Sequence, residues 1–142
     1  MFDSIASHFR DSIPAVDFCS LRIAREHSQD ITVRQGVLQP VGNLDDLGAM
    51  VVVHHDGGMG YAATGDLSPS GIDDAIEAAR QWAKRSAAVS VTNFSSVAMP
   101  HPQGHYETPV EQPWSSLSLA DKIDLLQRLS ARLKTDDRIV DW

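Results

Sequence analysis

The feature that most constrains the fold of this sequence is a β-hairpin followed directly by a helix. Residues 49–53 are apolar and rich in β-branched side chains, which is typical of a strand covered on both faces. Residues 55–58 form a turn sequence, because their glycines can adopt positive φ, and residues 59–64 supply the return strand. Ser68 and Pro69 then suit the cap and the first turn of a helix.

Three segments have the apolar period of an amphipathic helix, at residues 1–13, 68–85 and 118–133. The third begins with a capping box made by Ser118 and Asp121. On this pattern Trp82 belongs to the core. The predicted apolar stripes are Phe2, Ile5, Ala6, Phe9 and Ile13; then Ile72, Ala75, Ile76, Ala79, Trp82 and Ala83; and finally Leu119, Ile123, Leu126, Leu129 and Leu133.

Two further strands are predicted before the hairpin. Cys19, Leu21 and Ile23 alternate with polar or small residues, and a second alternating run covers residues 31–34. The polar residues 26–30 between them predict a short link, so we expect an antiparallel hairpin. Residues 36–48 are expected to form a connecting loop.

These elements predict an α+β fold in which amphipathic helices pack on an antiparallel β-sheet. We expect residues 1–142 to form a single domain with an extended, proline-punctuated segment at about 91–117. Within that segment, Trp114 either anchors the chain or meets a partner. Ile139 and Val140 resemble the beginning of a strand without a partner, which suggests a domain of a longer protein.

Composition excludes several classes of protein. The chain has 12 Lys and Arg against 19 Asp and Glu, a net charge of −7, whereas a dedicated nucleic-acid binder carries a basic excess. The single Cys19 cannot form an internal disulfide. No run approaches the roughly 20 apolar residues of a membrane span. We expect a cytoplasmic protein.

Histidines and glycines offer weak candidates for a site. His101 and His105 have the spacing of a helical metal pair, but Pro102 and Gly104 disfavour a helix there. His54 and His55 are adjacent in a strand, so their side chains point to opposite faces. The G-x-G at residues 58–60 continues into a strand rather than a helix, which disfavours a phosphate loop.

Nucleophilic and acidic residues give no stronger candidate. Cys19 lies on an apolar face and is interpreted as a small core residue, and an enzyme that uses Cys19 or His54 is the least favoured alternative. The adjacent aspartates at 73–74 and 136–137 are interpreted as solvated charge near helix ends. No catalytic or metal-binding residue is therefore predicted, and the sequence does not identify a substrate-binding residue.

Two segments together resemble a known family. They are the "ITVR-x-G" strand at residues 31–36 and the "GxGYAAT-x-DLS" strand and helix start at residues 58–68. With the following alanine-rich helix, residues 15–88 resemble the N-terminal domain of the TldD/PmbA metalloproteases, also called modulators of DNA gyrase. The residues that carry this resemblance, here called the signature residues, are Gly36, Gly58, Gly60, Tyr61, Ala62 and Thr64.

The resemblance implies a non-catalytic role for this chain. In the family the N-terminal domain shields a C-terminal domain that holds zinc on an H-E-x-x-x-H motif and hydrolyses peptides. No histidine here is followed by glutamate, so no cofactor is expected in this chain, and zinc would belong to the absent C-terminal domain. The implied partners are that C-terminal domain, a second subunit (identical or homologous) and unfolded or short peptides, with no nucleic acid and no membrane.

A second interpretation is a stand-alone protein-binding or adaptor module without catalytic activity. It would use the segment 91–117, with Tyr106 and Trp114, to dock a protein partner.

Overall fold

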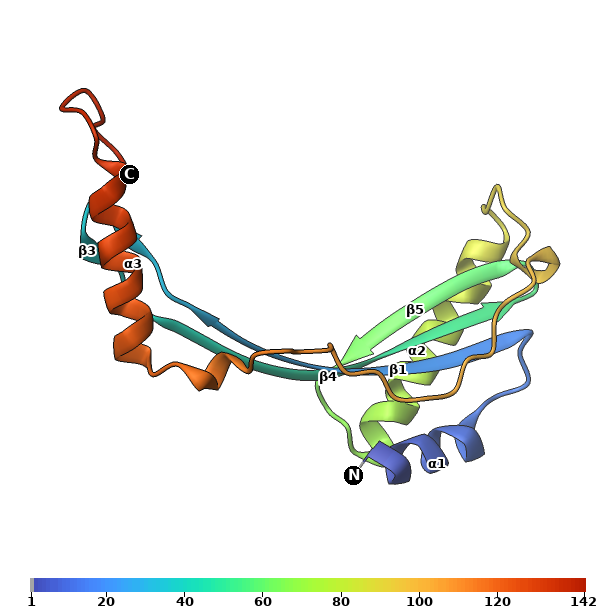
Figure 1. The fold of residues 1–142 in the computed structure, drawn as a ribbon. Coiled ribbons are helices and arrows are strands. Elements are labelled where there is room, and N and C mark those ends of the chain that lie inside the picture. Colours follow the sequence, from blue (N-terminus) through green and yellow to red (C-terminus); the bar gives the residue numbers. More distant parts are fainter. Residues whose placement is uncertain (1) are drawn as a thin grey trace. The chain divides into compact units, whose positions relative to one another are not determined.

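A computed structural model of the chain describes residues 2–142, which form two compact units. Unit 1 contains the chain up to Glu26 together with Asp46–Pro102, and unit 2 contains His27–Asp45 and Gln103–Trp142. The elements, in chain order, are α1 (Phe2–Ser12), β1 (Phe18–Asp30), β2 (Val33–Arg34), β3 (Val37–Leu38), β4 (Gly42–His55), β5 (Gly58–Thr64), α2 (Pro69–Ala87), the 3₁₀ turns η1 (Phe94–Ser96) and η2 (Trp114–Ser116), and α3 (Leu119–Leu133) (Figure 1).

The sheet of unit 1 has the strand order β1-β4-β5 and is antiparallel. The β4–β5 register runs from His55 opposite Gly58 to Ala49 opposite Thr64, so the predicted hairpin is confirmed. Asp56 and Gly57 have φ of 49° and 81°, as a two-residue hairpin turn requires. The fold is α+β, as predicted.

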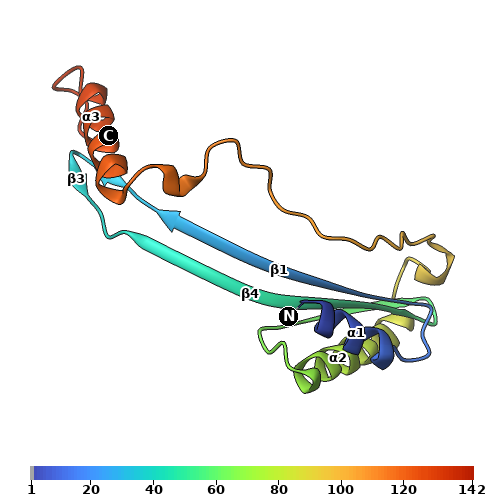
Figure 2. The same cartoon turned by 60° about the horizontal axis from the view of Figure 1, so that its bottom comes forward.

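Helices α1 and α2 lie on the same face of this sheet (Figures 1 and 2). Helix α2 begins as predicted, because the Ser68 Oγ accepts a hydrogen bond of 3.2 Å from the Gly71 amide and Pro69 follows the cap. The stripe that α2 buries packs against β5 and forms one buried cluster with alternate residues of β4. The buried hydrophobic core is Ile5, Phe9, Ala49, Val51, Val53, Ile72, Ala75, Ile76, Ala79 and Ala83.

Two predictions about this core are wrong. The strand at residues 49–53 is covered on one face only, because both helices lie on the same side and leave Met50 and Tyr61 exposed on the other. Trp82 is not a core residue: 56% of it is exposed, and the Arg85 guanidinium lies 5.2 Å from its ring. Small residues let the α2 backbone approach the sheet so closely that no space is left for an indole there.

The strands before the hairpin also differ from the prediction. Strand β1 continues through the polar residues 26–30, and β4 begins at Gly42 within the expected loop 36–48. Strand β2 pairs with β3 across a tight turn, Val33 opposite Leu38, whereas β1 pairs with β4. In residues 26–30 and 42–46 most side chains are exposed, so these strands form by backbone pairing without an apolar face.

Unit 2 contains helix α3 and the β2–β3 ribbon. The capping box of α3 is confirmed, with the Asp121 amide donating to the Ser118 Oγ at 3.1 Å. Ile139 and Val140 form no strand: this end of the chain is held to the ribbon turn by the Gln35 amide, which donates to the Trp142 carbonyl oxygen at 2.9 Å.

Unit 2 lacks a hydrophobic core among the residues described. Its buried side chains are Lys122 and Ser130, and every buried hydrophobic residue belongs to unit 1. Residues 91–117 contain the 3₁₀ turns η1 and η2 and otherwise no helix or strand, and most of their side chains are exposed. None of the helices in residues 2–142 combines the length and the apolar character needed to cross a membrane.

Candidate functional site

The signature glycines of β5 make room for helix α2. A Cβ on Gly58 would overlap the Ala83 carbonyl oxygen, and one on Gly60 would overlap the Ala79 carbonyl oxygen. Ala62 also packs against the core. The G-x-G therefore serves helix–sheet packing, and no anion-binding loop forms around it.

Two further signature residues shape turns. Gly36 has φ of 74° in the β2–β3 turn, where Gln35 also has a positive φ of 52°. The Thr64 Oγ1 accepts a hydrogen bond of 3.0 Å from the Asp66 amide, which bends the chain toward α2. Tyr61 is the exception, because it is 62% exposed on the open face of the sheet and has no evident packing role.

Polar and aromatic groups gather where η1 docks on the β4–β5 turn. The Gly57 amide donates to the Ser95 Oγ at 2.8 Å, and that hydroxyl donates to the Asp17 carboxylate at 2.7 Å. The hydrogen bond from Ser95 is the main reason why the pKa of Asp17 is lowered. A small cavity of about 70 Å³ remains here, lined by Asp17, Phe18, His54, Phe94, Ser95, Val97, Met99 and His101.

His54 is the buried member of this group, with 2% of its surface exposed. Its ring lies 5.2 Å from the Phe18 ring and 5.1 Å from the Phe94 ring, and its Nδ1 has no hydrogen-bond partner among the residues described. Burial lowers the pKa of His54, and the Asp17 carboxylate partly opposes that shift. A neutral imidazole packed between two phenyl rings stabilises the docked η1 and is poorly placed to exchange protons with a substrate.

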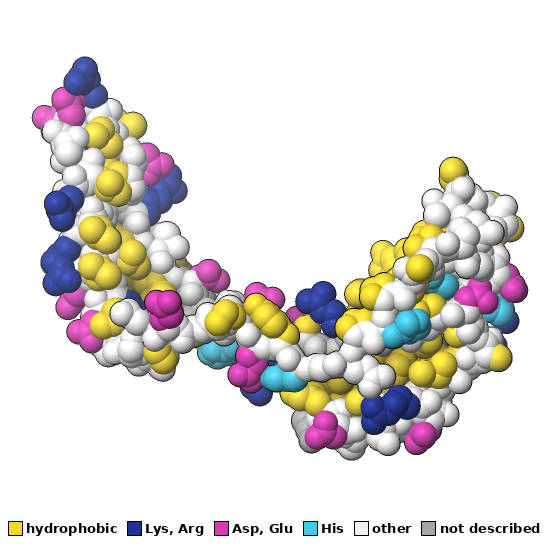
Figure 3. Space-filling model, turned by 45° about the vertical axis from the view of Figure 1, so that its right-hand side comes forward, with side chains coloured by type: hydrophobic (Ala, Val, Ile, Leu, Met, Phe, Trp, Pro, Cys, Tyr) yellow, Lys and Arg dark blue, Asp and Glu magenta, His cyan; other side chains and the backbone are white. Residues whose placement is uncertain are grey.

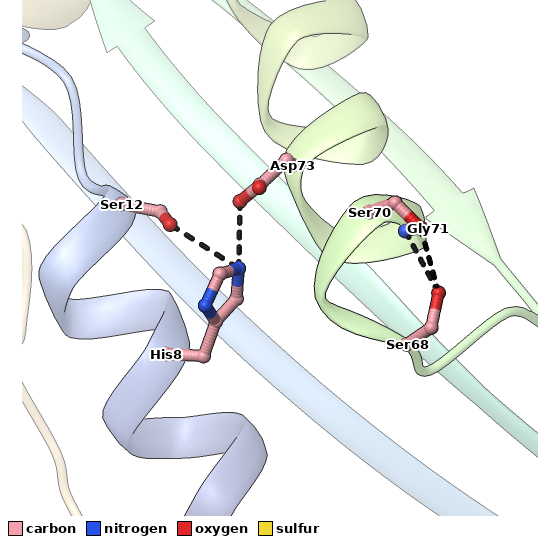
Figure 4. A network of polar contacts seen from close by, with 6 residues as sticks. All are labelled: His8, Ser12, Ser68, Ser70, Gly71 and Asp73. Atoms are coloured by element: carbon pink, nitrogen blue, oxygen red, sulfur yellow. Dashed lines mark hydrogen bonds and ion pairs between the residues drawn. The ribbon is translucent and has the colours of Figure 1, made fainter.

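A Ser-His-Asp group not singled out from the sequence connects α1 with α2 (Figure 4). The His8 Nε2 lies 2.8 Å from Asp73 Oδ1 and 3.3 Å from the Ser12 Oγ. In a catalytic triad the serine and the aspartate use different ring nitrogens, so that the aspartate orients the ring while the other nitrogen takes the serine proton. Here Ser12 and Asp73 both contact the Nε2 of His8, so the three residues link the two helices and do not form a nucleophile with its base.

The histidine pair considered from the sequence does not form a common site. The His101 ring lies 5.6 Å from the Phe18 ring, whereas His105 contacts Glu107 at 3.1 Å. Within the described part of the chain, no three His, Cys, Asp or Glu side chains are grouped so that they could hold a metal ion. These described residues therefore offer no ligand set that fits zinc, the ion that the resemblance assigns to a C-terminal domain and not to this chain.

Cys19 is half-buried and packs against the core, as its position in the alternating pattern predicted. Burial raises the pKa of its thiol to about 11. Because only the thiolate is nucleophilic, this side chain is unreactive near neutral pH.

In unit 2, Trp114 anchors the extended segment. Its indole Nε1 donates to the Gln29 Oε1 at 2.9 Å, and the Lys122 Nζ lies 4.1 Å from the centre of its ring. The same ammonium reaches the Gln29 Oε1 at 3.4 Å. Trp114 nevertheless remains 60% exposed, so it combines an anchoring contact with an open ring face.

The fold and these contacts define a class of protein: an α+β domain in which the polar groups described above link helices, strands and turns to one another. The sequence model described as PmbA/TldA metallopeptidase domain 1 matches residues 19–83, which span β1 to most of α2. Residues 19–83, somewhat under half of the chain, are thus similar to the first domain of the PmbA/TldD metallopeptidases. The comparison with curated proteins found no match to the chain.

Proposed function

We propose that this chain is the N-terminal, non-catalytic domain of a TldD/PmbA-like zinc metallopeptidase. The observation that carries the proposal is the match of residues 19–83 to the first domain of that family. In this proposal a C-terminal domain outside the 142 residues supplies the zinc and hydrolyses the peptide. This chain shields the active-site cavity, restricts the entry of peptides and contributes to a dimer in the cytoplasm.

The arrangement of the sheet supports a role in peptide access. Strands β1 and β5 are the edges of the three-stranded sheet, and an edge can hold an extended peptide by backbone hydrogen bonds. The open face beside β5 presents Met50 and Tyr61, whose apolar surface suits peptide side chains. Titration of the 15N-labelled chain with an unstructured peptide is expected to shift amide signals of β1 or β5. Unchanged signals at millimolar peptide would refute this part of the proposal.

The non-catalytic role is tested with the purified 142-residue chain. The chain is incubated with zinc and a fluorogenic unstructured peptide. We expect no more product than the peptide releases when the chain is absent. Zinc-dependent hydrolysis that disappears with a chelator would overturn the proposal. The intact mass of the protein from its source cell is expected to be several times 15.5 kDa.

The exposed aromatic residues favour one alternative, a stand-alone adaptor module. Tyr106 is 80% exposed and Trp114 keeps an open ring face, so the extended segment offers apolar contacts to a protein partner. A native mass of 15.5 kDa would favour this alternative over the peptidase domain.

A further inference from the structure

Helix α3 carries an apolar surface that unit 2 does not cover. Leu125 is 41% exposed, Leu129 46% and Leu133 60%, and Figure 3 shows hydrophobic side chains gathered along the helix. One helical turn separates each leucine from the next, so the three lie on one stripe. An uncovered stripe of this kind on a helix indicates an interaction surface.

The short β2–β3 ribbon explains why this surface is left open. The backbone of α3 lies close to these two strands of two residues each, and its Lys122 side chain also reaches Gln29 of β1 and Trp114 of η2. The side chains it buries are Lys122 and Ser130, the latter accepting a hydrogen bond of 3.2 Å from the Gly36 amide. The ribbon thus contributes the polar contact between Gly36 and Ser130, and it is too small to bury the leucines as well.

The charges on α3 are arranged for pairing with an identical helix in the opposite direction. The acidic residues Asp121 and Asp124 lie in its first half, where the one cation, Lys122, is buried against Trp114, and Arg128 and Arg132 lie in its second half. Asp124, Arg128 and Arg132 have no ion-pair partner within residues 2–142. When two copies lie antiparallel, the acidic half of each faces the basic half of the other, whereas a parallel pair places like charges together.

We propose that two copies of this chain associate through antiparallel α3 helices, with Leu125 of one copy against Leu129 of the other. The contact is isologous, so Asp121 of each copy comes close to Arg132 of its partner. This inference deepens the dimer named in the proposed function and rests on it, because it assigns the surface through which the two subunits meet. Partly exposed leucines and flanking charges give a reversible dimer that weakens as salt rises.

The first test measures association of the full chain by sedimentation equilibrium. Leu125→Glu and Leu129→Glu each place a carboxylate in the apolar contact, and we expect each to weaken the dimer at least tenfold. Gln127→Glu adds the same charge on the opposite side of the helix and is expected to leave the dimer unchanged. Far-UV circular dichroism verifies that all three variants keep the native helix content.

The second test determines the direction of the two helices and does not depend on the glutamate variants folding. In a Cys19→Ala background, Leu125→Cys and Leu129→Cys chains are mixed and oxidised. The antiparallel pair predicts a mixed disulfide between the two variants and little cross-linking of either variant alone. Cross-linking of each variant with itself would overturn the antiparallel arrangement, and no cross-linking in the mixture would overturn the α3 contact.

The outcomes separate this inference from the proposed function. A chain that stays dimeric with Leu125→Glu or Leu129→Glu overturns the α3 contact and leaves the dimer of the proposed function standing. A chain that is monomeric up to millimolar concentration overturns both. Neither result bears on the proposed non-catalytic role, which the peptide assay tests independently.

Discussion

Individual glycines of β5 determine how closely α2 lies on the sheet. We expect Gly60→Ala to destabilise the protein by roughly 2–3 kcal/mol, because its Cβ would overlap the Ala79 carbonyl and force the helix outward. Gly65→Ala is the matched control, since a Cβ there meets nothing within 4 Å. Urea unfolding of both variants measures the difference, and equal stabilities would contradict this account of the G-x-G.

Buried His54 makes the stability of unit 1 depend on pH. Burial lowers the pKa of His54 in the folded protein below the ordinary value of 6.5, so the unfolded chain binds a proton more readily. The contribution of His54 to the free energy of unfolding is complete above pH 6.5, and it is lost as the pH falls through the lower pKa of the folded state. His54→Phe is expected to flatten this decline between neutral and mildly acidic pH.

The control for His54→Phe is His105→Gln, because the imidazole of His105 is exposed beside Glu107. Urea unfolding at several pH values is expected to give the same slope for this control and the wild type. A steep acid decline that persists in His54→Phe would show that another group causes it.

Cys19 provides a measure of burial at the single-residue scale. Because burial raises the pKa of its thiol to about 11, we expect its reaction with a disulfide reagent at pH 8 to be at least tenfold slower in the folded protein than in urea. The absorbance of the released thiolate measures the rate. A native rate equal to that in urea would mean that the thiol is accessible and ionised normally.

Between elements, Ser86 connects α2 to β5. Its Oγ donates to the Met59 carbonyl oxygen at 2.7 Å and accepts from the Met59 amide at 2.9 Å. Ser86→Ala leaves both backbone groups without this partner, and we expect a loss of about 1–2 kcal/mol in urea unfolding. Ser90→Ala removes an exposed hydroxyl bonded to the Thr92 carbonyl and should cost less than about 0.5 kcal/mol. Equal losses would contradict the linking role of Ser86.

Among the helices, strands and turns, the sequence predicts those features that a few adjacent residues determine. The cap at Ser68, the turn at Asp56 and Gly57, and the capping box of α3 were predictable because each depends on a few adjacent residues. The continuation of β1 through residues 26–30 was not, because its exposed side chains carry no alternating pattern and only pairing with β4 makes it a strand. The pattern of apolar and polar residues therefore predicts a helix or strand only when one face of that element is buried.

The candidate sites were less predictable than the fold. The contact between His8 and Asp73 joins residues 65 positions apart, so no spacing rule could indicate it. The burial of His54 depends on η1, which the extended segment brings back to the β4–β5 turn. The uncovered leucines of α3 follow from the small size of its partner ribbon, whereas the sequence alone suggests an ordinary buried stripe.

At the scale of the whole molecule, the two units differ in what stabilises them. Unit 1 has ten buried hydrophobic residues, and unit 2 has none among the residues described. Since burial of apolar surface is the main favourable contribution to folding, unit 1 accounts for most of the stability of a single chain. Unit 2 depends on polar contacts such as the Arg34–Asp141 pair, which is exposed and therefore weak.

This difference predicts how hydrogen exchange depends on protein concentration. In a dilute sample, amides of β4 and α2 are expected to be protected up to global unfolding, whereas α3 exchanges through local opening. At concentrations where two copies associate, their α3 helices cover each other and opening must also break the dimer, so protection of α3 rises while that of α2 stays constant. In Leu129→Glu this dependence on concentration should disappear. Strong α3 protection in dilute wild-type protein would instead mean that unit 2 is stable without a second copy.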